Sequence, residues 1–447
     1  MRPVALLTLS VLVLSAHRAW SAPLTADEAV RIALQKNSTI LQSEAGVLSA
    51  RGGLWSAYSR VTPSVGANGT RNGQFTREAT GTQAFGSIPF SSSTFDREAY
   101  SGSYGLSGRW SVLDPSALVG LSAARAAMKG ASLTQKATRA DVRLETRRRF
   151  YTVVRAMHLA RVSAQALKLS RDDERRVRAL FQVGSVSRSD LLQAQVRTEQ
   201  SQLDSLVADH TVITQRISLA QWLAIPEQTL PEVDSTLSAS HEDINADVVL
   251  AEARKNRPDI RAAEANLKSA ELDLRSAHWS RLPSVSVSGS YDPSAVSSSR
   301  FFRSALRDTA TTVANESKKA WSGQLSLDFN LFDGFATDAR VASARSGLIR
   351  ARDTRDALVR DLEGEVRATL LTYQEAVERE SLAGRGLAAA AENLNLVQQK
   401  YNVGSATILD LINAELQLQR SQSDLVSALA DIRVAEAAVE RVRGAGE

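Results

Sequence analysis

The sequence predicts a mainly α-helical chain with a transmembrane β-barrel portion, and three observations carry this prediction. The chain repeats itself once, at an offset of roughly 220 residues. Four short segments alternate large apolar residues with small polar ones, as membrane strands do. Two segments of about 65 residues have the pattern of helices too long for a globular core.

Residues 1–21 are predicted to be a secretory signal peptide, with cleavage after Ser21 favoured over cleavage after Ala22. Arg2 gives a positive start, residues 4–14 are apolar but too few to span a bilayer, and small residues stand at 19 and 21. No later stretch approaches the 18 apolar residues of a membrane helix. The remaining chain is therefore expected to be soluble beyond the inner membrane or to enter a membrane as strands.

Composition excludes several classes of protein. The chain has no Cys, which rules out disulfides and a lipid anchor on an N-terminal Cys, and its five His are isolated, so no metal site is expected. The net charge of +5 is mild and no Lys/Arg block occurs, so no nucleic-acid partner is expected. Neither a Gly-x-Ser-x-Gly motif nor a P-loop is present, and we expect no enzyme and no cofactor.

The internal repeat divides the chain into a first repeat at 22–230, a linker at 231–245 and a second repeat at 246–447. Four anchor segments recur in the same order at nearly the same spacing. They pair 35–40 with 254–260, 56–65 with 276–285, 106–114 with 325–333, and 181–191 with 401–411.

Each copy has the same predicted order of elements: a helix, a strand, a polar loop, a strand, a very long helix and a returning helix. Helices are expected at about 26–58, 116–180 and 190–224, then at 246–279, 335–400 and 408–443. Strands are expected at about 61–73 and 99–112, then at 283–292 and 321–332, with extracellular loops at 74–98 and 293–320.

The strands favour a membrane barrel over a soluble sandwich, because Ser occupies nearly every position of their polar face. Five aromatic residues are expected at the membrane interface, although some could pack between subunits: Tyr100, Tyr104, Trp110, Tyr291 and Trp321. Four strands cannot close a barrel, since the smallest membrane barrels have about eight. The chain must therefore oligomerise, with eight strands as a dimer or twelve as a trimer.

The last helix carries a heptad seam of alternating large and small residues, which predicts coiled-coil-like packing. Large residues recur every seven positions and small residues three positions later. The large ones are Leu411, Leu418, Leu425, Ile432 and Val439, and the small ones are Ala414, Ser421, Ala428 and Ala435.

Four motifs give the chain a family resemblance. They are Asn-Arg-Pro-Asp-Ile at 256–260, Leu-Pro-Ser-Val at 282–285, Phe-Asn-Leu-Phe-Asp-Gly at 329–334, and Tyr-Asn-Val-Gly-Ser at 401–405. Together with the duplication, they make the mature chain similar to the outer-membrane efflux protein family, also called outer membrane factors or the TolC family.

The resemblance implies a TolC-like homotrimer in the outer membrane of a Gram-negative bacterium, with a 12-stranded β-barrel in the lipid and an α-helical barrel in the periplasm. It implies the passive exit duct of a tripartite efflux or type I secretion system. Its partners would be a periplasmic adaptor (membrane fusion) protein and an inner-membrane pump of RND or ABC type. The competing hypotheses are a trimeric coiled-coil adhesive or structural protein without transport, and an outer-membrane enzyme.

The resemblance also assigns roles to the two helical tips, 181–190 and 401–410. Adaptor docking falls on Val183, Gly184, Ser185, Val403, Gly404 and Ser405, although a Gly also simply ends a helix. An iris-like gate falls on Asp190, Asp410, Tyr401 and Asn413. The acids could equally stabilise helix N-termini, and Tyr401 could be ordinary packing. Ala406 and Asn413 stand where the best-known member of the family has an Arg and a second acid.

Overall fold

The structure, a computed structural model, describes residues 23–79, 84–85, 88–89, 94–238, 244–304 and 307–444. The predicted signal peptide lies outside the described residues. The chain forms two compact units, one of Met1–Ala45, Thr134–Asp259 and Val359–Glu447 and one of Gly46–Leu133 and Ile260–Leu358. Among the helices described, none is both long and apolar enough to cross a membrane.

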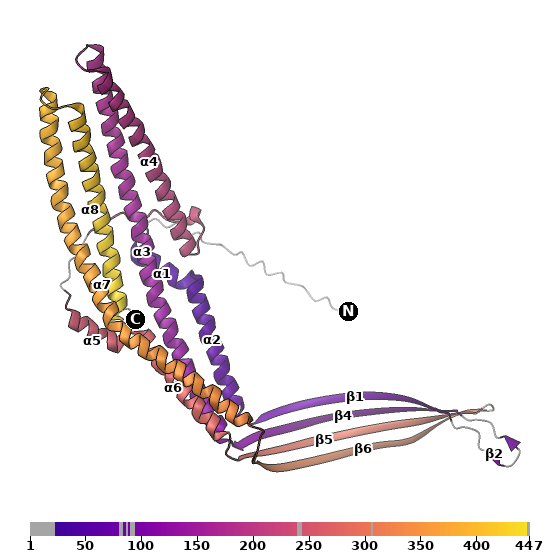
Figure 1. Cartoon of the computed structure of the whole chain (residues 1–447). Helices are drawn as coiled ribbons and strands as arrows, with labels where there is room; N and C mark the ends of the chain where they lie inside the picture. The colour runs from indigo at the N-terminus through magenta and orange to yellow at the C-terminus, as the bar shows by residue number, and fades with distance from the viewer. Residues whose placement is uncertain are drawn as a thin grey trace, which may run out of the picture. The chain divides into compact units, whose positions relative to one another are not determined.

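The second unit contains an antiparallel sheet with the strand order β1-β4-β5-β6 (Figure 1). Its strands are β1 (Ser64–Ala79), β4 (Thr94–Leu113), β5 (Ser284–Ser304) and β6 (Arg307–Asp328). A separate pair is formed by β2 (Ala84–Phe85) and β3 (Ile88–Pro89). The four long strands enter most of the segments predicted as loops, 74–98 and 293–320. Hydrogen bonds between strand backbones do not require alternating apolar side chains. The strands therefore extend beyond the alternating segments from which they were predicted.

The register gives the sheet two chemically different faces. On one face Leu106 pairs with Tyr291, which pairs with Trp321, and Val287 pairs with Leu325. On the other face Ser pairs with Ser across the strands, and the hydroxyls bond at 2.7 Å between Ser286 and Ser326 and 2.9 Å between Ser290 and Ser322. Thr70 and Ser103 continue this hydroxyl face at 2.6 Å.

Helical segments of the same unit pack closely through small residues. In this unit α6 (Pro258–Trp279) lies against the start of α3 (Pro115–Gln182). The hydroxyl of Ser276 donates to the carbonyl of Ser116 at 2.8 Å, and that of Ser269 to the carbonyl of Ala123 at 3.0 Å. A Cβ on Gly130 would lie 2.1 Å from Asn266 Oδ1, so any larger residue here would push the Asn266 amide aside.

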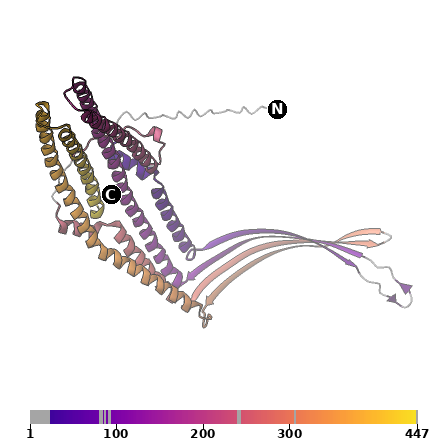
Figure 2. The same cartoon turned by 45° about the horizontal axis from the view of Figure 1, so that its top comes forward.

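The first unit is built on two helical hairpins that lie side by side in both Figure 1 and Figure 2. One hairpin joins α3 to α4 (Arg188–Trp222), and the other joins α7 (Ala336–Asn402) to α8 (Ile408–Arg443). The predicted seam of α8 is confirmed, because its small positions and most of its large ones are buried. A larger core around Phe150, Val153 and Leu219 joins the first hairpin to the N-terminal helices.

The predicted single helices 26–58 and 246–279 are wrong, because each divides in two. The first becomes α1 (Ala26–Lys36) and α2 (Ser38–Ser59), and the second becomes α5 (Ala246–Asn256) and α6. Asn37 and Arg257 stand at the breaks with extended backbone. Pro258 disfavours helical backbone at Arg257, and Asn37 Oδ1 accepts the N–H of Thr39 at 2.8 Å.

Candidate functional site

The two helical tips have the same backbone geometry. Gly184 and Gly404 both adopt left-handed backbone, with φ of 77° and 76°. In the first turn the N–H of Gly184 donates to Phe181 at 3.0 Å and that of Ser185 donates to Leu180 at 2.9 Å. The second turn has the same two bonds at the same lengths. Both are Schellman motifs, which satisfy the last carbonyls of a helix and let the chain reverse.

Each returning helix then begins with a capping box. Asp190 Oδ2 accepts the N–H of Ser187 at 3.0 Å, and Ser187 Oγ accepts the N–H of Asp190 at 3.2 Å. Asp410 and Thr407 make the same pair of bonds at 2.8 and 3.2 Å. The hydroxyl and N–H of Thr407 hold the pKa of Asp410 below its ordinary value. Both acids thus stabilise the N-termini of their helices, which is one of the two roles predicted for them.

The two tips meet in one apolar cluster. Val177 and Ala194 of the first hairpin pack with Ile408 and Leu411 of the second, and Tyr401 is among the half-buried residues around them. Burial raises the pKa of Tyr401; the nearby Asp173 and Asp190 add to this effect and Arg176 opposes it. The cluster holds the two hairpins of the chain together at their tips.

The remaining predicted tip residues point outward. Val183 and Val403 are 74% and 79% exposed, and Ser185, Ser405 and Asn413 are exposed too. A Cβ placed on either turn Gly would meet nothing within 4 Å. The turns therefore offer exposed apolar side chains beside open backbone.

A buried acid pair below the tips was missed by sequence reasoning. Asp173 of α3 and Glu415 of α8 are only 7% and 6% exposed, and their carboxyls lie within hydrogen-bonding reach of each other. Burial raises the pKa of Glu415 well above its ordinary value, and the Asp173 carboxylate raises it further. One hint of this pair is local, since Glu415 directly follows Ala414 on the buried seam.

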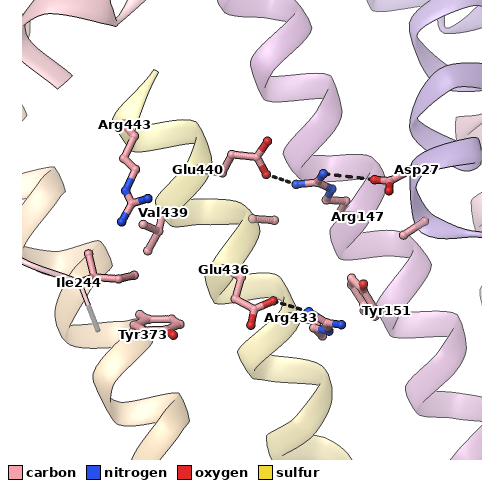
Figure 3. Close-up of a pocket in the computed structure, with 12 residues that line it drawn as sticks. Asp27, Arg147, Tyr151, Ile244, Tyr373, Arg433, Glu436, Val439, Glu440 and Arg443 are labelled. Atoms are coloured by element: carbon pink, nitrogen blue, oxygen red, sulfur yellow. Dashed lines mark hydrogen bonds and ion pairs between the residues drawn. The ribbon is translucent and has the colours of Figure 1, made fainter. Parts of the chain in front are cut away.

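A cavity of about 470 Å³ lies farther along the hairpins, lined by α1, α3, α7, α8 and Ile244 (Figure 3). Arg147 reaches between Glu440 and Asp27, with Nη2 3.3 Å from Asp27 Oδ1. Arg433 Nη1 lies 2.8 Å from Glu436 Oε2. Arg147 thus joins α3 to α1 and α8, whereas the Arg433–Glu436 pair lies within α8.

The described residues offer no metal centre, since no three His, Asp or Glu among them gather closely enough to hold an ion.

The five aromatic residues predicted for a membrane interface share the apolar face of the sheet. Tyr291 and Trp321 are cross-strand partners with ring centroids 4.5 Å apart, on the level of Leu106. Trp110 lies four residues farther along β4, about 13 Å away along the strand. Its indole N–H donates to the carbonyl of Val61 at 3.1 Å. Tyr100 and Tyr104 stand on the same face, both largely exposed.

Comparison with known proteins agrees with this architecture. The model of the family described as "Outer membrane efflux protein" matches residues 29–224 and 249–445, one match in each repeat. Nodulation protein T of Rhizobium leguminosarum bv. trifolii is 27% identical over 60% of this chain and 55% of its own length. Outer membrane protein TolC of Escherichia coli (strain K12) is 22% identical over 56% of this chain and 50% of its own. The chain thus spans about half the length of these relatives.

A solved structure shares the fold. The outer membrane protein VceC of Vibrio cholerae superposes with a TM-score of 0.72, at 15% identity, over 94% of this chain and 96% of that one. Duplicated hairpins and a two-faced sheet give the chain a TolC-like fold, as the sequence predicted. The chain belongs to the outer membrane efflux protein family, whose place is the outer membrane of Gram-negative bacteria.

Proposed function

We propose that the chain is one subunit of a homotrimeric exit duct in the outer membrane, passively conducting solutes outward as part of a tripartite efflux or type I secretion system. Its partners would be a periplasmic adaptor (membrane fusion) protein and an inner-membrane pump of RND or ABC type. The chain itself would catalyse no reaction, and the pump would supply the energy for transport.

The observation that carries this proposal is the two-faced sheet. Its apolar face, with Leu325 and Trp321 largely exposed, suits lipid, and its hydroxyl face suits water. The described sheet ends in β1 and β6, whose outer backbone groups need partners within a bilayer. Joining β1 of one copy to β6 of the next closes a barrel, and three copies supply twelve strands.

The helical tips support a gate at the periplasmic end. The apolar cluster joins the two hairpins within a chain, so opening would require Val177 and Ala194 to separate from Ile408 and Leu411. Asp410 is exposed beside this cluster and keeps its charge, because its pKa is lowered. Three-fold symmetry would gather three such carboxylates at the axis and favour cations there. Tyr401, Asp190 and Asn413 complete the proposed gate.

The Gly-tipped turns support adaptor docking. Val183 and Val403 present apolar side chains, and the open backbone at Gly184 and Gly404 leaves room for an approaching hairpin. Because both turns have the same geometry, each repeat offers one docking position.

The test is a planar-bilayer recording on the purified chain, with its mass measured in detergent. The chain lacks Cys, so single cysteines can be placed on the two faces of β6. Ser322→Cys lies on the hydroxyl face, and Leu325→Cys lies on the apolar face. A trimer whose current is reduced by a charged thiol reagent only at position 322 is expected. A monomer or dimer, no current, or equal effects at both positions would overturn the duct.

A further inference from the structure

Asp173 and Glu415 are buried next to the apolar cluster that joins the two hairpins. Asp173 lies one turn before Val177 on α3, and Glu415 lies one turn after Leu411 on α8. Val177 and Leu411 belong to the apolar tip cluster, to which α4 contributes Ala194 and α7 contributes Tyr401. The acid pair therefore occupies the layer next to the cluster that joins the hairpins.

Neither oxygen of the Asp173 carboxylate receives a hydrogen bond from the rest of the described chain. Arg176 Nη2 comes within 3.3 Å of Asp173 Oδ1, but without hydrogen-bond geometry. Two ionised carboxyls in this position would both be acceptors and would repel each other across a poorly solvated gap. A proton on Glu415 supplies the missing donor and joins the two groups.

The other charged groups around the pair come from each packed helix. Arg176 on α3 and Arg197 on α4 act on Glu415, and the Tyr401 hydroxyl on α7 lies near Asp173. Lys168 and Asp172 of α3 line a cavity together with Glu415. Arg197 Nη2 donates to Gln419 Oε1 at 3.0 Å. The two guanidinium groups favour ionised Glu415 but are outweighed by burial and by Asp173.

We propose that Asp173 and Glu415 form a proton-operated latch between the two hairpins, closed while the carboxyls share a proton and loosened when that proton leaves. The latch rests on the proposed channel function, for which it would regulate the periplasmic end. A cavity of about 310 Å³, lined by Glu415, Arg197 and Gln419 among others, gives the proton a route from solvent.

The direction of the pH effect follows from proton counting. When the hairpins part, Glu415 meets water and its pKa returns toward the ordinary value of about 4.3. Between that value and the raised pKa of the closed form, the closed form holds one more proton per chain than the open form. Raising the pH therefore favours the open form, by up to about tenfold per pH unit for each chain.

The experiment measures how fast a thiol between the hairpins is labelled. Ala194→Cys places a thiol in the tip cluster, where Ala194 is 4% exposed, and Val183→Cys gives an exposed reference. The ratio of their labelling rates by a maleimide, taken from about pH 6 to about pH 9, cancels the common pH dependence of thiol reactivity. We expect this ratio to rise with pH in the otherwise native chain.

Two isosteric variants supply the latch donor permanently. In Glu415→Gln the titrating group is gone and the amide donates to Asp173, so the ratio should stay low and flat. In Asp173→Asn the amide donates to Glu415 and the neighbouring carboxylate is gone, but Glu415 stays buried, so the ratio should rise less steeply with pH than in the native chain. Glu392→Gln removes an exposed carboxyl of α7 and should follow the native profile. Native pH profiles in both latch variants, or a flat profile in the native chain, would overturn the latch.

The labelling readout needs no transport, which separates the latch from the duct. A pH-dependent ratio without any bilayer current would retain the latch and remove the proposed channel function. A bilayer current together with a labelling ratio that is unchanged in the Glu415→Gln variant would retain the channel function and reject the latch.

Discussion

Asn37 and Arg257 hold the same position in the two repeats, and each is a buried polar residue at the break between two helices. Their partners differ. Asn37 Nδ2 donates to the carbonyl of Trp222 at 2.8 Å, whereas Arg257 binds the carboxylates of Asp259 and Glu365. Glu365 in turn binds Arg441, so the second repeat uses a charged network where the first uses one amide.

Replacing Arg257 by Ala should destabilise the chain strongly. The guanidinium is 6% exposed, and its loss would leave Glu365 and Asp259 without their shared cation. Removing one partner of a buried ion pair typically costs about 3–5 kcal/mol. Denaturant unfolding in detergent measures the change. Arg254→Ala, an exposed Arg on α5, is the control and should change the free energy of unfolding by less than about 0.5 kcal/mol. Equal effects of the two changes would contradict the network.

Adding a methyl group at the turn glycines should strain the backbone without any clash. Gly184→Ala and Gly404→Ala would each force an L-residue to φ near 77°, at a cost of about 1–2 kcal/mol. Gly384→Ala, inside α7 with open space around it, should instead stabilise the chain by about 0.5–1 kcal/mol. Thermal unfolding measures all three, and a loss of stability at Gly384 would refute this account.

The two glycines of α3 that face α6 should respond differently to the same change. A Cβ on Gly120 would lie 3.6 Å from Ser276 Oγ, an ordinary contact, whereas a Cβ on Gly130 would collide with the Asn266 amide. Gly130→Ala should therefore be less stable than Gly120→Ala by about 1–3 kcal/mol. Urea unfolding compares them, and the double change Gly130→Ala with Asn266→Ala should recover part of the loss.

Two changes at Asp410 distinguish its roles as a cap and as a gate charge. Asn keeps an oxygen that can accept the Thr407 N–H but removes the charge, whereas Ala removes both. If the charge matters, both variants should lose cation selectivity in bilayer recordings. If only the cap matters, Asn should behave as the native chain does and Ala alone should change the conductance.

The pH dependence of the Asp410 cap has a definite sign. Its pKa is lowered in the folded chain, so the cap contributes fully above the ordinary Asp value of about 3.9. The contribution is lost as the pH falls through the lower, folded pKa. The stability of the Asp410→Asn variant should therefore fall less steeply with decreasing pH than that of the native chain. An identical dependence of stability on acid pH in the two chains would contradict this prediction.

Periodic features of the sequence predicted most of the fold. The heptad of α8, the alternation from Tyr100 to Val112 and the Gly turns at 184 and 404 are local patterns, and each forms the predicted element. The break at Asn37 was not predicted, because a helix pattern runs through it. Besides its local bond to Thr39, Asn37 is held by the carbonyl of Trp222, which lies 185 residues away in sequence.

The parts of the candidate site that lie within one short sequence motif could be predicted. The part that depends on contacts between distant segments could not. The capping boxes follow from Ser187 and Asp190 spaced three apart, which the sequence displays. Asp173 and Glu415 lie 242 residues apart in sequence. Neither residue looks unusual alone among the many acids of a mixed-charge helix, and only the folded hairpins bring them together.

The hydroxyl face of the sheet has a consequence for what could pass along it. Ser and Thr hydroxyls rotate freely between donor and acceptor roles, so a passing solute can replace each Ser–Ser bond with one of its own. This face is mostly uncharged, with Arg109, Asp292 and Asp328 among its exceptions, so its hydroxyls would hold a passing solute only loosely. Selection among solutes would then occur mainly at the carboxylates of the helical tips. The outer half of the passage would be a hydrated pore with little selectivity of its own.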